Sequence, residues 1–206
     1  MSTEKTISQK YESLTLLSAG DFKAFLYDCD GTLADNMGLH KKAWVRVAAQ
    51  QGVYIEEAII DEFAGLPTPQ VVMEINKRYN SSLPPEKFAE DREEMFLNEY
   101  QHQTQPVEYV VNHLKAHKGK MKIGVVSGSK REVVEKTLTI LGIADLPEVL
   151  VCAGETPKGK PFPDPFLLAA EKLGILPSEC LVFEDGDAGT KAAEAAGMKW
   201  VRIDRV

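Results

Sequence analysis

Residues 24–32 have the sequence Ala24-Phe25-Leu26-Tyr27-Asp28-Cys29-Asp30-Gly31-Thr32, a short apolar run that passes directly into two carboxylates and a turn. An apolar run of this length predicts a strand that is buried on both faces. Side chains alternate along a strand, so Asp28 and Asp30 can point the same way where the strand ends. The stretch therefore predicts a buried strand with two acidic groups at its carboxyl end.

Similar apolar runs recur later in the chain, and amphipathic helical patterns separate most of them. These runs cover residues 123–126, 149–152, 180–183 and 200–203. Strands that alternate with helices and are apolar on both faces are typical of a parallel sheet covered by helices. We therefore predict an α/β fold with a Rossmann-like parallel sheet as its core.

One long interval breaks this alternation. Between the first run and Ile123 the sequence shows helical patterns around 39–51, 56–63, 69–79, 85–101 and 107–117, but no comparable strand. We predict an all-helical cap domain over 34–103, inserted after the first strand, and a core domain formed by 21–33 and 104–206. Residues 1–20 are predicted to be a polar helical N-terminal extension without a signal-peptide pattern.

Composition restricts the classes of protein that remain. The chain has 206 residues, 44% of them hydrophobic, and a formal net charge of −7, which is typical of one globular domain with a small insert. An acidic chain argues against nucleic-acid or anionic-membrane partners, and no apolar run is long enough for a membrane span. The three cysteines, Cys29, Cys152 and Cys180, lie in or beside apolar runs, so we expect reduced core cysteines and a cytoplasmic location. We also expect a monomer.

Polar residues follow four of the predicted strands. They are Asp28-Cys29-Asp30-Gly31-Thr32, Ser127-Gly128-Ser129-Lys130, Lys158-Gly159-Lys160-Pro161 and Glu184-Asp185-Gly186-Asp187. In an open α/β sheet, ligands bind at the carboxyl ends of the strands. Each stretch alone could be ordinary turn chemistry, but together they place two acidic clusters, a hydroxyl and a lysine at one edge of one sheet.

This combination indicates phosphate chemistry with a metal ion. Four carboxylates, Asp28, Asp30, Glu184 and Asp185, cannot share a small volume without a cation, and Mg²⁺ prefers oxygen ligands. Lys160 adds a positive charge for a phosphate, while Ser127 or Thr32 can hold its oxygens together with nearby backbone N–H groups. One of the carboxylates can serve as the nucleophile and form an aspartyl phosphate.

These residues resemble the haloacid dehalogenase-like phosphohydrolases, whose four sequence motifs are present in order from about Ala24 to the C-terminus. The resemblance implies that Asp28 is the nucleophile and Asp30 the general acid/base, with Ser127 and Lys160 also in the catalytic set. It implies Mg²⁺ held by the Asp28 and Asp185 carboxylates and the Asp30 backbone carbonyl, with Glu184 close to or in the ligand set.

The stretch Lys160-Pro161-Phe162-Pro163-Asp164 is similar to the form of the third motif in the β-phosphoglucomutase-like subgroup, whose members carry a helical cap after the first motif. In that subgroup a histidine at the position of His40 contacts the reacting centre. We therefore predict substrate-binding roles for a set of five residues. They are Thr32, His40, Gly128, Ser129 and Lys130.

Two reaction classes remain open. The first is a Mg²⁺-dependent phosphatase for a small phosphorylated metabolite, since His40-Lys41-Lys42-Ala43-Trp44 and the fourth motif look similar to those of fructose-1-phosphate and other sugar-phosphate phosphatases. The alternative is a sugar phosphomutase, which needs cations on the cap loop; Ala64-Gly65-Leu66-Pro67-Thr68-Pro69 has none. Dehalogenation is a weaker third hypothesis because it needs no acid such as Asp30, and a binding module would not retain the complete acidic set.

Overall fold

The computed structural model describes residues 5–63 and 66–206 of the chain. Within these residues, five strands form a parallel sheet in the order β5-β4-β1-β6-β7. The strands are β1 (Ala24–Tyr27), β4 (Lys122–Val126), β5 (Val149–Val151), β6 (Cys180–Glu184) and β7 (Lys199–Arg202). The predicted α/β fold is confirmed, and the first apolar run is the central strand.

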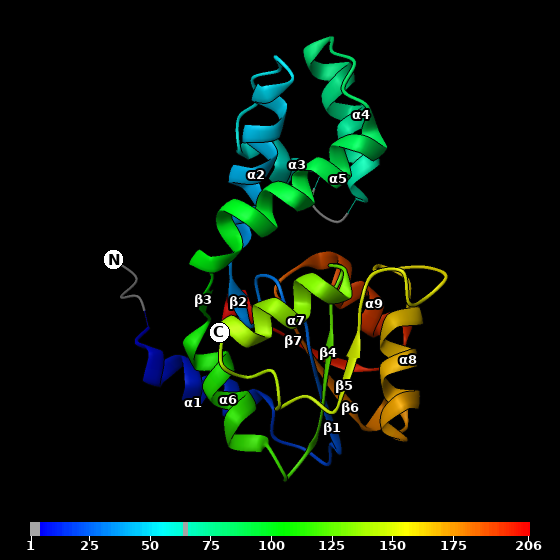
Figure 1. The fold of residues 1–206 in the computed structure, drawn as a ribbon. Helices are drawn as coiled ribbons and strands as arrows, with labels where there is room; N and C mark the ends of the chain where they lie inside the picture. The colour runs from blue at the N-terminus through cyan, green and yellow to red at the C-terminus, as the bar shows by residue number, and fades with distance from the viewer. Residues whose placement is uncertain (1–4, 64–65) are drawn as a thin grey trace. The chain divides into compact units, whose positions relative to one another are not determined.

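Helices cover both faces of this sheet (Figure 1). One face carries α1 (Ile7–Leu17), α6 (Glu108–His117) and α7 (Arg131–Ile140), and the other carries α8 (Asp164–Leu173) and α9 (Asp187–Ala195). The central strand serves both layers, because Phe25 and Tyr27 pack into the first and Leu26 into the second. Burial on both faces explains why β1 is continuously apolar.

The N-terminal helix α1 belongs to the core unit. Tyr11 and Leu14 are three residues apart and so share one helix face; Leu14 is fully buried in the cluster beneath α6, and Tyr11 packs against it. The Ser18 hydroxyl lies 2.9 Å from Nε2 of His113. The helix predicted within residues 1–20 is present as α1, and it packs on the core because its apolar residues Tyr11 and Leu14 fall on one face.

The helical unit spans Asn36–Thr104. It contains α2 (Met37–Gln50), α3 (Ala58–Glu62), α4 (Thr68–Tyr79), α5 (Pro85–Met95), a π-helical turn (Phe96–Tyr100) and a 3-10 turn (Gln101–Gln103). Its own core includes Trp44, Ile75 and Phe88, with the Trp44 and Phe88 rings 5.2 Å apart. Ala64 and Gly65 of the cap loop lie outside the described residues.

A short antiparallel pair stands at the two ends of this insert. β2 (Ala34–Asp35) pairs with β3 (Gln105–Pro106), and both belong to the unit that contains the parallel sheet. The sequence analysis predicted neither strand, because two residues are too few to show a period. None of the described helices has the length and apolar composition needed to cross a membrane.

Candidate active site

The register of the sheet brings the predicted motifs together. Tyr27 is level with Val125 of β4 and with Phe183 of β6, so the residues that follow each strand emerge side by side. The Asp28 N–H donates to the Phe183 carbonyl at 3.0 Å, which extends the strand pairing by one residue. Asp28 therefore leaves the sheet at its carboxyl edge beside Glu184, the last residue of β6.

A tight turn after β1 positions the second carboxylate. The Cys29 carbonyl accepts hydrogen bonds from the N–H groups of Leu33 and Ala34, both at 2.9 Å. Gly31 adopts a φ of 87°, a conformation that glycine reaches without steric cost. The turn keeps Asp30 on the same side as Asp28, as the alternation along the chain predicted.

Lys160 is the centre of the buried charges. Its Nζ atom lies 2.6 Å from Oδ1 of Asp28, 2.6 Å from Oε1 of Glu184 and 2.8 Å from the carbonyl oxygen of Val126. The three charged side chains are only 12%, 9% and 3% exposed for Lys160, Asp28 and Glu184, respectively. The ammonium thus satisfies its three donors within the site, which buried charge requires.

The site holds more negative than positive charge. Burial and the neighbouring Glu184 carboxylate raise the pKa of Asp28 to about 7, although Lys160 opposes the shift. Burial and the charge of Asp28 raise the pKa of Asp185 to about 7. Burial would lower the pKa of Lys160, but its two carboxylate partners raise it, so the amine stays charged. One lysine does not neutralise this set.

The donor atoms of the cluster suit a hard cation. Carboxylate oxygens of Asp28, Glu184 and Asp185 lie within 4.8 Å of one another. Oxygen-only donors and partial burial are what Mg²⁺ prefers, and a cation there would reverse the upward pKa shifts of Asp28 and Asp185. Because both Glu184 oxygens already have partners, Lys160 and the N–H of Gly186, Asp28 and Asp185 are the better direct ligands.

Two glycines give these carboxylates their space, and the sequence analysis assigned neither a role. A Cβ at Gly189 would lie 1.7 Å from Oε1 of Glu184, and a Cβ at Gly31 would lie 2.2 Å from Oδ2 of Asp185. Any side chain at either position would displace an acidic group. Gly189 lies inside α9, where glycine is disfavoured, and that placement is the signal that could have revealed a close approach.

The acid/base candidate Asp30 is held by two serines. Ser129 donates its hydroxyl to Oδ2 of Asp30 at 2.7 Å, and the Ser127 hydroxyl reaches the same oxygen at 3.4 Å. Ser127 is buried, whereas Asp30 and Ser129 are partly exposed. The structure thus brings Asp28, Asp30 and Ser127 to the same strand ends as Lys160.

The remaining predicted substrate contacts divide into three kinds. Thr32 is fully buried, and its hydroxyl donates to Oδ1 of Asp185 at 3.4 Å, which favours a role in holding that carboxylate rather than substrate. Gly128 and Lys130 are exposed just before α7. His40 belongs to the cap unit, where its ring stacks on Phe96 with centroids 3.8 Å apart.

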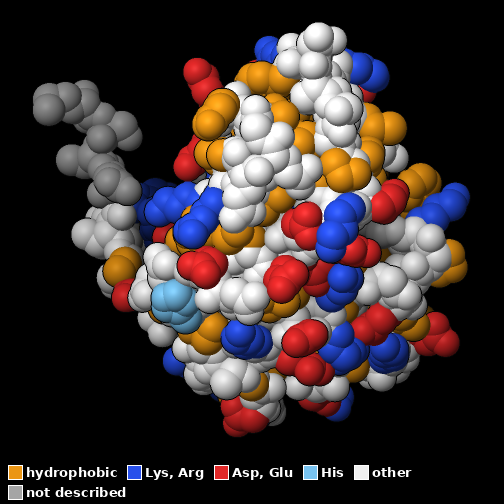
Figure 2. Space-filling model, turned by 45° about the horizontal axis from the view of Figure 1, so that its top comes forward, with side chains coloured by type: hydrophobic (Ala, Val, Ile, Leu, Met, Phe, Trp, Pro, Cys, Tyr) orange, Lys and Arg blue, Asp and Glu red, His pale blue; other side chains and the backbone are white. Residues whose placement is uncertain are grey.

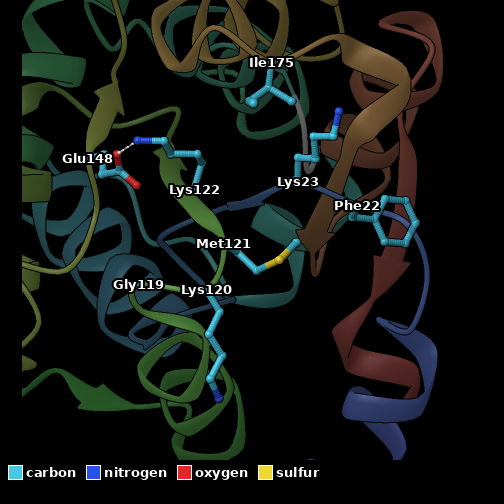
Figure 3. Close-up of a pocket in the computed structure, with 8 residues that line it drawn as sticks. All are labelled: Phe22, Lys23, Gly119, Lys120, Met121, Lys122, Glu148 and Ile175. Carbon is cyan, nitrogen blue, oxygen red and sulfur yellow. Dashed lines mark hydrogen bonds and ion pairs between the residues drawn. The ribbon is translucent and has the colours of Figure 1, made fainter.

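The amino edge of the sheet, opposite the candidate active site, carries a pocket whose charged side chains are more exposed. It has a volume of about 330 Å³ and is drawn in Figure 3. Its lining residues are Phe22, Lys23, Gly119, Lys120, Met121, Lys122, Glu148 and Ile175. Lys122 pairs with Glu148 across it at 2.5 Å, and both side chains are about half exposed.

On the face shown in Figure 2, acidic and basic side chains are interspersed over the surface.

Comparison with known proteins identifies the class. The family model for haloacid dehalogenase-like hydrolases matches residues 22–197, so the chain belongs to this family and is a hydrolase. It is 31% identical over 182 residues to the fructose-1-phosphate phosphatase YqaB of Escherichia coli (strain K12), a match that covers 88% of this chain and 96% of that protein.

Two further similarities agree with this assignment. A phosphorylated carbohydrates phosphatase of Thermotoga maritima is 27% identical over 180 residues, covering 86% of this chain and 82% of that protein. The crystal structure of a hydrolase of the same family from Deinococcus radiodurans R1, with bound phosphate and sodium, is 28% identical with a TM-score of 0.69, covering 88% and 80% of the two chains.

Proposed function

We propose that the protein hydrolyses phosphoric monoesters of small metabolites, in particular sugar phosphates such as fructose 1-phosphate, through a phosphoryl group carried transiently on Asp28. The observation that carries the proposal is the buried contact of Lys160 with Oδ1 of Asp28 and with Glu184. It fixes one Asp28 oxygen and leaves the other for attack. The sugar phosphate is favoured because relatives named for such substrates match this chain over most of its length.

In the proposed reaction, the free oxygen of Asp28 forms a bond to phosphorus as the bond to the leaving sugar oxygen breaks. Asp30 donates a proton to that oxygen, so the sugar departs as an alcohol rather than an alkoxide. Asp30 then accepts a proton from a water molecule, which attacks the phosphorus. The Asp28–phosphoryl bond breaks, and both carboxylates return to their starting states.

The other residues bind and orient the phosphoryl group. Lys160 supplies a fixed positive charge, and we assign phosphate contacts to Ser127 and to the exposed start of α7 at Gly128 and Lys130. His40 is proposed to contact substrate from the cap, and the protein is proposed to act as a monomer. Preorganised donors of this kind stabilise the charge of the transition state and so lower the activation free energy of group transfer by a large part.

The proposed cofactor is Mg²⁺, which would be held by the carboxylates of Asp28 and Asp185 and the backbone carbonyl of Asp30, with Glu184 beside them. When bound, it supplies positive charge to the phosphoryl oxygens. Support for it comes from the oxygen-only donors within 4.8 Å of one another. Excess EDTA should therefore abolish turnover, and added Mg²⁺ should restore it.

The direct test uses Asp28→Asn with Asp21→Asn as a matched control, since Asp21 is exposed. The Asp28 variant should fold but show no turnover of fructose 1-phosphate and no phosphoryl adduct in quenched samples analysed by mass spectrometry. The Asp21 variant should behave like the parent. Undiminished turnover by the Asp28 variant would exclude the covalent route, and isomerised sugar phosphate in place of inorganic phosphate would indicate a mutase.

A further inference from the structure

The hydroxyl of Ser129 contacts a carboxylate of the protein itself. It donates to Oδ2 of Asp30 at 2.7 Å, an ordinary length for an O–H···O hydrogen bond. The neighbouring Ser127 hydroxyl reaches the same oxygen at only 3.4 Å. Of the two serine hydroxyls, that of Ser129 therefore makes the closer contact with this oxygen.

Ser129 is itself held on both sides of its backbone. Its N–H donates to the Ser127 hydroxyl at 3.0 Å, and its carbonyl accepts from the N–H of Ala153, also at 3.0 Å. These contacts link the segment that follows β4 to the one that follows β5. The backbone of Ser129 is consequently held between the two loops that follow these strands.

Asp30 needs such an anchor. It is partly exposed, so the orientation of its carboxylate depends on the contacts that hold it. A misplacement of about 1 Å at a reacting group can cost roughly 10²-fold in rate.

We propose that Ser129 is a positioning residue, whose hydroxyl fixes the Asp30 carboxylate in the orientation needed for proton exchange with the leaving group and with water. This inference rests on the proposed function, because it takes Asp30 as the acid/base. It differs from the substrate-binding role that the sequence predicts for Ser129, since the acceptor is Asp30 rather than a phosphate.

The test compares Ser129→Ala with Ser129→Thr, which keeps a hydroxyl. An alkyl phosphate needs a proton for its leaving group, whereas p-nitrophenyl phosphate does not. We expect Ser129→Ala to lower kcat/KM about 10–100-fold on the alkyl phosphate, with less than a threefold change in kcat/KM on p-nitrophenyl phosphate. The comparison uses kcat/KM, which reports the step that releases the leaving group, because the later attack of water also needs Asp30 and is common to both substrates. Ser129→Thr should recover most of the loss. Equal losses on both substrates with a raised KM would overturn the proposal in favour of a phosphate contact.

Two further variants separate this inference from the proposed function. Asp30→Asn should show the same dependence on the leaving group, and adding Ser129→Ala to it should cost nothing more. If Asp30→Asn is selective and Ser129→Ala is not, only the role of Ser129 fails; if neither is selective, the proposed role of Asp30 fails as well. Ser178→Ala, at an exposed serine just before β6, is the matched control and should be without effect.

Discussion

The two edges of the central sheet hold the same kinds of charged residue at nearly the same distances. At the carboxyl edge Lys160 lies 2.6 Å from Asp28, with both side chains almost buried; at the amino edge Lys122 lies 2.5 Å from Glu148, with both about half exposed. Burial and the neighbouring Glu184 raise the pKa of Asp28 in the first pair to about 7. The two ion pairs have nearly the same length but differ in burial, and a buried charge interacts more strongly with its neighbours than an exposed one.

The largest effect is expected from removing the cation at the carboxyl edge. Lys160→Met should leave Asp28 and Glu184 facing each other without compensation, so we expect a loss of about 3–5 kcal/mol in the free energy of unfolding. The loss should be greater at pH 8 than at pH 6, because Asp28, with a pKa of about 7, is more fully charged at pH 8. We also expect kcat/KM to fall by roughly 10²–10³-fold.

The matched control is Lys122→Met, which removes a half-exposed partner of Glu148 at the other edge. Its cost should be about 1 kcal/mol or less, since exposed ion pairs contribute little, and kcat should not change. Denaturant unfolding of both variants measures the difference. Equal destabilisation would contradict the contrast between the two edges.

A smaller effect should follow from Gly189→Ala, which tests how the buried edge is kept open. The added Cβ would lie 1.7 Å from Oε1 of Glu184, so that carboxylate must move and release its contact with Lys160. We expect kcat/KM to fall about 10²-fold, although alanine favours the helix. Gly38→Ala is the control, because nothing lies within 4 Å of a Cβ there. A fully active Gly189 variant would mean that Glu184 has another acceptable position.

The effect that is smallest at neutral pH concerns a buried titratable group away from both edges. His113 is fully buried, with its ring nitrogens 2.9 Å from the hydroxyls of Ser18 and Tyr27. Burial and the nearby His117 lower the pKa of His113 from 6.5 to about 3. Between about pH 6.5 and pH 3, His113 is therefore protonated in the unfolded chain but neutral in the folded chain. The contribution of neutral, buried His113 to the free energy of unfolding is fully present above about pH 6.5 and is lost as the pH falls towards 3.

We expect the free energy of unfolding to decrease by up to about 1.4 kcal/mol per pH unit below pH 6.5 through this group alone. Asp28 and Asp185, whose pKa values are raised, contribute the opposite slope. The measurement is consequently the difference in slope between the parent and His113→Gln, with the exposed His102→Gln as control. Identical slopes in the parent and the His113 variant would show that burial here does not suppress protonation.

Periodicity and composition were sufficient for the fold because its elements are long or strongly apolar. The five strands lie within one residue of their predicted positions, and the four polar loops follow them as expected. The pairing of β2 with β3 was missed because two-residue strands carry no pattern. The packing of α1 on the core was not predicted, because Leu14 is the one buried side chain of this helix and a single buried position shows no periodic pattern.

Residue types alone could not determine which groups of the site form hydrogen bonds with one another. The sequence placed Asp30, Ser129 and Lys160 at one edge, but the hydrogen bond from Ser129 to Asp30 depends on which rotamers the packed loops allow. The Val126 carbonyl that accepts from Lys160 belongs to the backbone and has no signature at all. Such contacts can be known only from the three-dimensional structure, whereas the four motifs can be recognised from their residue types.

The central position of β1 also has a consequence for the order in which the molecule can assemble. Ala24 of β1 pairs with Lys122 and with Cys180, which are far along the chain, whereas the helical unit is one continuous segment of the chain. Local contacts form early, and pairings distant in sequence form late. Because β1 lies between β4 and β6, which both follow it in the chain, its pairing can be completed only after β6 has been synthesised. Asp28, which follows β1, is thus enclosed only when these distant pairings form.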